Sequence, residues 1–237
     1  MSSDPPPRPR LERRPSPPPP PAWAVDPDGR LKTAPGSVKL ALTGGVASGK
    51  STVAELLVAF GAARIDFDEL SRQALAPGTE GRRAAVELFG PKIEKPDGAL
   101  DRRTMARIIF KKAETRKALE AIVHPAAWRL MLEALPKPGG GPPLTVIEVP
   151  LLYEAALDSL FAPTALTYAS PDAQLKRLRD RNQALGGREA KRMLAAQLPM
   201  SEKLRRADYV VDNDGSLTHL IRRVRELRDR LVGGPPR

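Results

Sequence analysis

The stretch VKLALTGGVASGKST, residues 38–52, decides the fold of this chain. Its first six residues predict a short buried strand, and the residues from Lys50 to about Phe60 predict a helix. Between them, every fixed position of the pattern G-x-x-x-x-G-K-[ST] is matched. Gly44 and Gly49 permit backbone angles that turn consecutive N–H groups into one concavity, where they can surround phosphate oxygens. A plain glycine turn is the alternative, but the flanking strand and helix are those that phosphate binding requires.

Each part of this phosphate loop, residues 44–51, has an expected task. The N-terminus of the following helix adds partial positive charge and unpaired N–H donors. Lys50 is placed to reach the β- and γ-phosphates of ATP, and the Ser51 hydroxyl can bind Mg²⁺. The residues expected to hold the nucleotide are Gly45, Val46, Ala47, Ser48, Gly49, Lys50, Ser51 and Thr52.

The remaining chain alternates between strand and helix patterns. Strands are predicted at 63–66, 144–149, 164–169 and 209–212. Helices are predicted at 67–76, 80–89, 101–110 and 114–135, after Ser170-Pro171, and at about 216–231. This alternation predicts an α/β fold, the three-layer α/β/α architecture of P-loop NTPases with a parallel five-stranded sheet. We expect one P-loop domain over residues 37–232, with a helical substrate-binding insert at 67–138 and a helical lid at 176–206.

Composition limits the remaining possibilities. Prolines concentrate in residues 1–36, so this segment is expected to be a disordered tail, as are residues 233–237; the run Pro17–Pro21 could alternatively bind a proline-recognising domain. The absence of cysteine excludes disulfides, thiolate zinc sites and a cysteine nucleophile. No apolar run is long enough for a membrane helix and no secretory core is seen, so a cytoplasmic protein is expected.

The net charge of +11 indicates a partner that carries phosphate. Nucleic acid and anionic small molecules both satisfy this condition. Aromatic residues make up only 4% of the chain, which disfavours a surface that stacks single-stranded bases. We therefore expect small-molecule substrates and no nucleic-acid, membrane or obligate protein partner.

Two carboxylates follow the second predicted strand, at the end where open α/β sheets bind ligands. A hydroxyl that accepts a phosphoryl group needs a nearby carboxylate to orient it and take its proton. Asp66 and Asp68 are the candidates, although either could instead cap a helix. Beside a phosphate loop, we expect at least one of them to serve the acceptor.

Arginines crowd the region after the fourth predicted strand, at positions 177, 179, 181, 188, 192, 205 and 206. They could form a solvated helix face with ion pairs. The break at Asn182–Gly187 instead favours a hinged lid whose arginines grip a triphosphate and exclude water. The chain is too short for a helicase with two motor domains and lacks the N-K-x-D segment of guanine-specific GTPases, so a kinase is favoured.

Taken together, the motifs resemble the dephospho-coenzyme A kinase family from about Val38 to Leu231. The matching pieces are residues 42–53, Ile65–Asp68 with Arg72, Val123–Pro125, Val149–Glu154, Gln197 and Ala207–Gly215. The resemblance implies MgATP-dependent phosphorylation of the ribose 3′-hydroxyl of dephospho-CoA, the last step of coenzyme A synthesis. The alternatives are another P-loop nucleoside or nucleotide kinase, or a regulatory NTPase that binds nucleic acid.

The resemblance also implies residue roles. Asp68 would be the catalytic carboxylate, with Lys50 and Arg181 at the transferring phosphoryl group and Asn213 beside adenine. Asp66, Arg72 and His124 would face dephospho-CoA, although a histidine before proline could equally pack on a helix surface. Ala47 stands where the family often has glycine, at a free position of the motif. Phe67 replaces a usual small residue, and either crowds the acceptor pocket or turns into the core.

Overall fold

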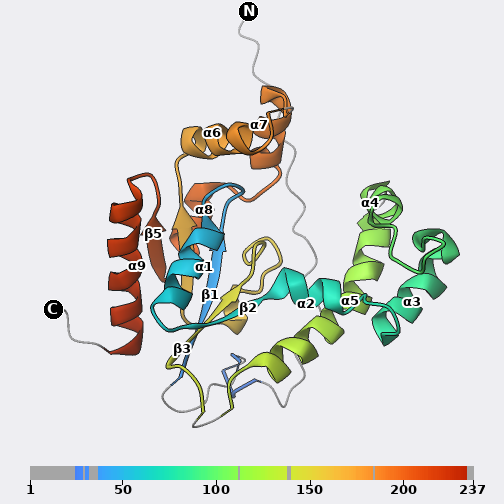
Figure 1. Cartoon of the computed structure of the whole chain (residues 1–237), viewed down its shortest axis with the longest axis horizontal. Coiled ribbons are helices and arrows are strands. Elements are labelled where there is room, and N and C mark those ends of the chain that lie inside the picture. The colour runs from blue at the N-terminus through green and yellow to red at the C-terminus, as the bar shows by residue number, and fades with distance from the viewer. Residues whose placement is uncertain are drawn as a thin grey trace, which may run out of the picture.

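A computed structural model describes residues 25–28, 30–31, 37–111, 113–137, 140–183 and 185–233. Its centre is a five-stranded sheet in the order β2-β3-β1-β4-β5, in which every pairing is parallel (Figure 1). The strands are β1 (Val38–Gly44), β2 (Ala63–Asp66), β3 (Leu144–Glu148), β4 (Thr164–Tyr168) and β5 (Tyr209–Asp212). The predicted sheet is therefore confirmed. Because the strands are parallel, all their carboxyl ends lie along one edge.

Helices cover both faces of the sheet, because the strand side chains alternate between two apolar clusters. Leu40 and Leu42 of β1 pack with α1 (Lys50–Ala59) and α9 (Leu217–Val232) on one face. Ala41, between them, belongs to the opposite cluster, which includes residues of α2 (Phe67–Gln73) and α5 (Ala113–Ala134). This is the expected three-layer arrangement.

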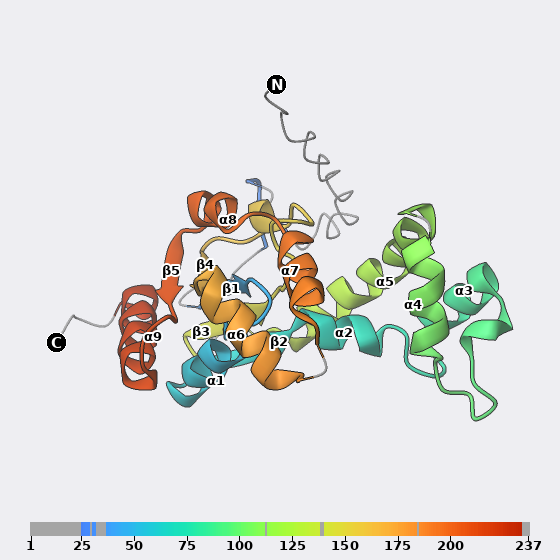
Figure 2. The same cartoon turned by 90° about the horizontal axis from the view of Figure 1, so that it is seen from above.

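The helical stretch between β2 and β3, called the insert, projects to one side of the sheet in both views (Figures 1 and 2). It comprises α2, α3 (Glu80–Phe89), α4 (Arg102–Lys111) and α5, with a short 3₁₀ turn (η2) at Pro91–Ile93. The outer helices have a separate apolar cluster centred on Ala85, Phe89 and Ile93. Trp128 of α5, 1% exposed, packs against Phe67 within the insert and stacks on Phe161 outside it, which ties the insert to the main body. The predicted helices of this stretch are confirmed within a few residues.

A second helical group follows β4 and comprises α6 (Pro171–Arg181), α7 (Gly187–Ala195) and α8 (Met200–Arg206). Ser170 caps α6 by accepting a hydrogen bond from the Ala173 N–H, and Pro171 occupies the first turn, as the sequence predicted. Helices α6 and α7 stand above the turn that joins β1 to α1 (Figure 1). These helices, with the segments between them, are called the lid.

Residues 25–28 and 30–31 lie within the stretch expected to be a disordered tail, and the structure describes contacts for them. Val25 and Leu31 form an antiparallel bridge, and the Leu31 N–H donates to the Leu160 carbonyl at 2.9 Å. Leu31 is 5% exposed and belongs to the cluster that contains Trp128. Burying one leucine side chain stabilises the folded state by about 1.5–3 kcal/mol. The high proline content of residues 1–36 gives no sign of such a single buried residue.

The other terminal expectations lie mostly outside the described residues. These include the proline run at 17–21, the rest of the expected tail and residues 234–237. Gly233 is described: it ends α9 in the left-handed conformation that favours glycine. None of the described helices is both long and apolar enough to cross a membrane.

Candidate active site

The phosphate loop joins β1 to α1 at the carboxyl edge of the sheet, and its two fixed glycines are required for different reasons. A Cβ on Gly44 would lie 2.4 Å from the Ser48 hydroxyl oxygen, so this position needs glycine for space. Gly49 has a φ of 90°, and a Cβ there would lie 2.1 Å from the Asn213 amide nitrogen. Ala47 is also left-handed, with a φ of 57°, so the loop keeps its turn with alanine at this position.

Three side chains from distant segments hold the loop in place. The Asn213 amide, just after β5, donates to the Ser48 carbonyl at 2.7 Å. Arg177 of α6 donates to the same carbonyl at 3.2 Å and to the Asn213 carbonyl at 2.5 Å. Gln197, which precedes α8, accepts a hydrogen bond from the Val46 N–H at 2.9 Å. The lid and β5 therefore fix the shape of the phosphate loop directly.

The contact by Arg177 differs from the expectation for the lid arginines. Arg181, the residue expected at the transferring phosphoryl group, is exposed at the C-terminal end of α6 and pairs with no residue in the described part of the chain. Arg177 lies one helical turn earlier and touches the loop instead. The spacing of four residues places both arginines on one face of α6, so the sequence pattern alone does not tell the loop-bound arginine from the exposed one.

Lys50 pairs with the carboxylate of Glu148, the last residue of β3. Arg64 of β2 binds the other oxygen of that carboxylate, with its Nε at 2.6 Å from Oε1. The side chain of Glu148 is only 1% exposed. Glu148 was not among the predicted site residues, although a carboxylate at the end of the apolar strand LTVIE was a usable signal.

Asp66 and Asp68 have different environments. Asp66 caps α2: its Oδ1 accepts hydrogen bonds from the backbone N–H groups of Asp68 at 2.9 Å and Glu69 at 3.2 Å. Asp68 lies in the first turn of α2, where it reaches solvent and also lines a pocket. Burial raises the pKa of Asp68, the negative charge of Asp66 raises it further, and the cation of Lys50 opposes both. The cap and the pocket-facing carboxylate are thus separate residues.

The pocket beside Asp68 has a volume of about 100 Å³ and is bounded by α2, α5 and the segment after β3. His124 of α5 lines it; its Nδ1 is buried and has no hydrogen-bond partner among the described residues. Burial lowers the pKa of His124, so the imidazole is neutral near neutral pH. Phe67 was expected either to crowd the pocket or to turn into the core, and it does part of each. It is buried against Trp128 and also lines this pocket.

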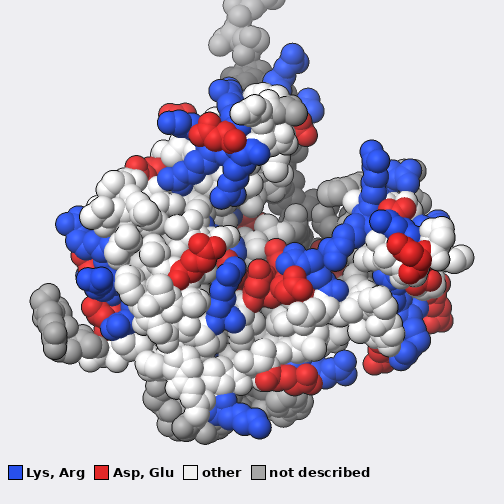
Figure 3. Space-filling view, in the orientation of Figure 1, with Lys and Arg blue, Asp and Glu red and all other residues white. Residues whose placement is uncertain are grey.

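The remaining predicted acceptor residue, Arg72, is half exposed on α2. Its guanidinium pairs with Glu69 at 2.6 Å, and its positive charge acts on Asp68. Figure 3 shows acidic and basic side chains together on the face where the lid and the insert flank the end of the sheet. The site is therefore a region of mixed charge.

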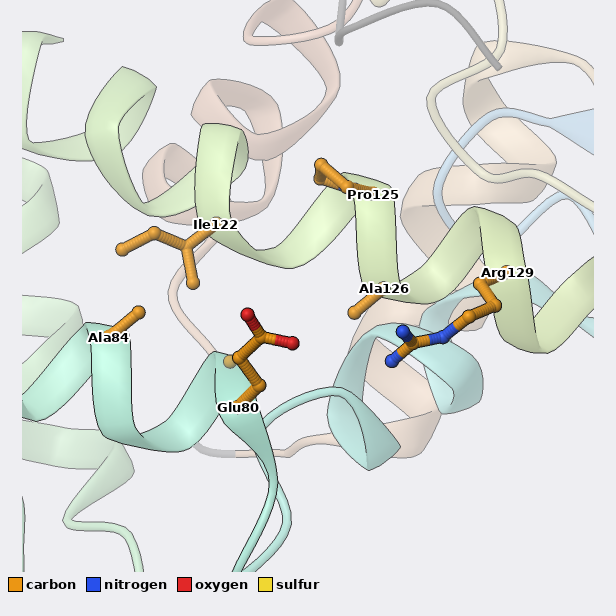
Figure 4. A pocket seen from close by; sticks show the side chains of 7 residues that line it. Glu80, Ala84, Ile122, Pro125, Ala126 and Arg129 are labelled. Atoms are coloured by element: carbon orange, nitrogen blue, oxygen red, sulfur yellow. The ribbon is translucent and has the colours of Figure 1, made fainter. Parts of the chain in front are cut away.

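A larger cavity of about 270 Å³ lies between α3 and α5 (Figure 4). Glu80 and Arg129 point into it from these two helices, over an apolar wall of Ala84, Ile122 and Ala126. None of the predicted site residues lines this cavity. Its wall on α5 is formed by residues beside His124 in sequence, so the same helix separates the two hollows.

Comparison with known proteins identifies the family. The family model described as dephospho-CoA kinase matches residues 38–219. The chain belongs to the dephospho-CoA kinase family. It is 43% identical to the dephospho-CoA kinase of Anaeromyxobacter dehalogenans, over 82% of this chain and 92% of that protein. It is 42% identical to the one of Geobacter sulfurreducens, over 79% of this chain and 95% of that protein.

A solved structure shares this fold. The crystal structure of TT1252 from Thermus thermophilus matches with a TM-score of 0.70 and 34% identity, over 82% of this chain and 98% of that one. Membership of the dephospho-CoA kinase family makes this chain a kinase. The family match begins at Val38 and contains every predicted site residue. The docked segment with Val25 and Leu31 precedes it.

Proposed function

We propose that this kinase transfers the γ-phosphoryl group of ATP to the ribose 3′-hydroxyl of dephospho-CoA, which gives CoA and ADP in the last step of coenzyme A biosynthesis. The observation that carries the proposal is the position of Asp68, which lines the acceptor pocket while interacting electrostatically with Lys50 of the phosphate loop. The family assignment supports the same acceptor. Donor and acceptor groups would therefore meet at one edge of the sheet.

On the donor side, the phosphate-loop amides from Gly45 to Thr52 and the N-terminus of α1 would bind the ATP phosphates. Lys50 would turn from Glu148 toward the β- and γ-phosphates. Asn213 is 8% exposed and bonded to the loop, so it would support nucleotide binding by holding the loop, and the end of β5 would bound the adenine site. Arg181 is free to approach the triphosphate from the lid, and closure would exclude water from the reaction.

Magnesium fits the donor set of this site. Among the described residues, no group of three or more His, Asp or Glu side chains could enclose a metal. Mg²⁺ that accompanies ATP needs no such cage, because phosphate and water oxygens supply most of its ligands. The Ser51 hydroxyl would hold the ion, whose charge would neutralise the phosphate oxygens.

On the acceptor side, Asp68 would orient the 3′-hydroxyl and accept its proton as the phosphoryl group is transferred. Its raised pKa makes it a better proton acceptor than an ordinary aspartate. Neutral His124 would offer a hydrogen bond inside the pocket, and Arg72 would supply positive charge toward the phosphates of dephospho-CoA. Asp66 would contribute by fixing the start of α2. A cytoplasmic location would give the enzyme its ATP.

The test compares acceptors in one assay. The purified chain is incubated with ATP, Mg²⁺ and either dephospho-CoA, adenosine or AMP, and the products are measured by mass spectrometry. We expect CoA and ADP from dephospho-CoA and much slower turnover of the other two. Asp68→Asn should lower kcat by about 10²–10⁴-fold, because the general base is lost.

The matched control is Asp97→Asn, on the exposed turn between α3 and α4. Its Oδ1 accepts from the Ala99 N–H at 2.9 Å, a contact that asparagine retains. We expect this variant to keep full activity. Preferential phosphorylation of adenosine or AMP, or full activity in Asp68→Asn, would contradict the proposed function.

A further inference from the structure

The carboxylate of Glu148 is buried between two cations that use different oxygens. Arg64 binds Oε1, with its Nε at 2.6 Å and one terminal nitrogen at 2.5 Å, whereas Lys50 binds Oε2. The Glu148 side chain is 1% exposed, and those of Lys50 and Arg64 are 16% and 36% exposed. The carboxylate is thus withdrawn from water, and its charge is balanced from two sides.

Nucleotide binding creates a conflict at this group. Lys50 is the lysine of the phosphate loop, so a bound nucleotide requires its ammonium group at the phosphates. If Lys50 were the sole counter-ion, its departure would leave a buried, unpaired carboxylate, which is strongly unfavourable. Two more carboxylates stand close by, since Asp66 is the strand neighbour of Glu148 and Asp68 feels its charge. If Lys50 moved away, these three carboxylates would therefore lose a nearby positive charge and repel one another more strongly.

Arg64 is placed to remove this conflict. It lies on β2, whose parallel pairing with β3 sets Arg64 opposite Val146 and Asp66 opposite Glu148. Its contact is to the oxygen that Lys50 does not use, so Lys50 can leave without disturbing it. A guanidinium remains charged at all relevant pH values and can grip a carboxylate with two donors. The edge strand therefore supplies a permanent cation beside Glu148.

We propose that Arg64 is a positioning residue for nucleotide binding: it is the standing counter-ion of Glu148 and leaves Lys50 free to bind the phosphates of the nucleotide. The proposal rests on the proposed function only in that the ligand is a nucleoside polyphosphate. It assigns Arg64 no contact with either substrate. Its effect should be confined to ligands that carry the phosphates which Lys50 binds.

The experiment measures equilibrium binding of ADP and of adenosine in EDTA, by ligand-observed NMR, for the full chain and its variants. In Arg64→Gln, we expect the Kd for ADP to rise about tenfold or more, because Lys50 must now abandon Glu148 to bind phosphate. The Kd for adenosine should stay unchanged, since adenosine does not recruit Lys50. Arg64→Lys keeps the charge and should bind ADP within about threefold of the parent.

A double variant makes the test specific. Glu148→Gln in the Arg64→Gln background removes the buried charge, so ADP affinity should return to within about threefold of the parent. The matched control is Arg223→Gln on α9, which breaks a half-exposed pair with Glu226 far from the site and should change neither Kd. Thermal unfolding of each variant confirms that it folds.

The contrary outcomes are equally definite. The proposal is wrong if Arg64→Gln binds ADP like the parent, if ADP and adenosine weaken equally, or if the double variant binds ADP as weakly as Arg64→Gln. All of these results are independent of the acceptor. Failure to phosphorylate dephospho-CoA would overturn the proposed function and leave this result standing.

Discussion

At the scale of single residues, the contrast between Asp66 and Asp68 shows how the backbone divides two chemically identical side chains between different tasks. One oxygen of Asp66 accepts two N–H groups at the start of α2. Asp68, two residues later, accepts no such bonds from the described residues and lines the pocket that His124 also lines. Its pKa is raised above the ordinary aspartate range by burial and by Asp66.

This raised pKa gives a prediction for the pH dependence of activity. Asp68 must be ionised to accept a proton, so kcat/KM should fall as the pH decreases through its pKa in the folded enzyme. Because that pKa is raised, the decline should begin at a higher pH than an ordinary aspartate, with a pKa of about 3.9, would produce. A pH–rate profile at saturating ATP measures it; activity that stays level down to about pH 4 would contradict the assigned role.

The raised pKa of Asp68 also predicts a pH dependence of stability, opposite in direction to that of activity. The folded protein binds the Asp68 proton more tightly than the unfolded chain, so this group favours the fold at low pH and loses that contribution as pH rises through the folded pKa. Asp68→Asn should therefore increase the free energy of unfolding at neutral pH. The gain should vanish below about pH 3.9, where aspartate is protonated in both states. Urea unfolding of parent and variant across this range decides it.

At the scale of secondary-structure elements, the first turn of α2 depends on its cap. Asp66→Ala should lower the free energy of unfolding by about 1 kcal/mol and also reduce kcat, because α2 carries Asp68. Asp66→Ser should retain most stability and more activity than the alanine variant, since a hydroxyl can accept the same N–H bonds. Urea unfolding and steady-state kinetics measure the two effects.

The control for this prediction is the cap of the next helix. Thr79 caps α3 by accepting from the Arg82 N–H at 3.1 Å. Thr79→Ala should cost a similar amount of stability with little change in kcat. Equal losses of kcat in the two alanine variants would show that general destabilisation, and not the position of Asp68, explains the result.

A buried ion pair joins α8 to the segment after β3. The Lys203 ammonium lies 2.7 Å from Glu154 Oε1, and the two side chains are 1% and 7% exposed. The same oxygen accepts the Leu198 N–H at 3.1 Å. Glu154→Gln should lower the free energy of unfolding by about 3–5 kcal/mol, because it leaves a buried lysine without its counter-ion.

A neighbouring surface pair on α8 provides the comparison. Glu202 and Arg205 pair in solvent, where the arginine side chain is 75% exposed. Glu202→Gln should change the free energy of unfolding by less than about 0.5 kcal/mol. Chemical denaturation of both variants measures the difference, and similar costs would mean that burial does not set the strength of these pairs.

At the scale of the whole molecule, the segment before the family domain contributes to the core. Leu31 packs in the cluster that contains Phe67 and Leu157, two residues that also line the pocket beside Asp68. Leu31→Ala should lower the free energy of unfolding by about 2–4 kcal/mol. Leu217→Ala, at a leucine that is 62% exposed, should cost less than about 0.5 kcal/mol. Denaturant unfolding measures both, and equal costs would show that the docked segment does not support the core.

The strand segments and most helices followed from sequence because their signals are local, whereas the order of the strands in the sheet was not predicted. The Ser170-Pro171 start of α6 and the glycine pattern of the phosphate loop depend on neighbouring residues. The partners of Glu148 do not: Lys50 is 98 positions away and Arg64 is 84 away, and strand register alone brings them together. The burial of Leu31 and the contact of Arg177 with the phosphate loop were missed for the same reason. The expected absence of a nucleic-acid partner stays a prediction, which salt-dependent binding measurements would check.

The outer helices of the insert have an apolar cluster of their own, separate from the two clusters that sandwich the sheet. Substitutions that repack Phe89 or Ile93 therefore leave the packing beneath the phosphate loop untouched. The insert can therefore change in sequence by small steps without altering the core of the nucleotide-binding body. Protein engineering can likewise replace the apolar residues inside the insert, or fill the cavity between α3 and α5, without redesigning the phosphate loop.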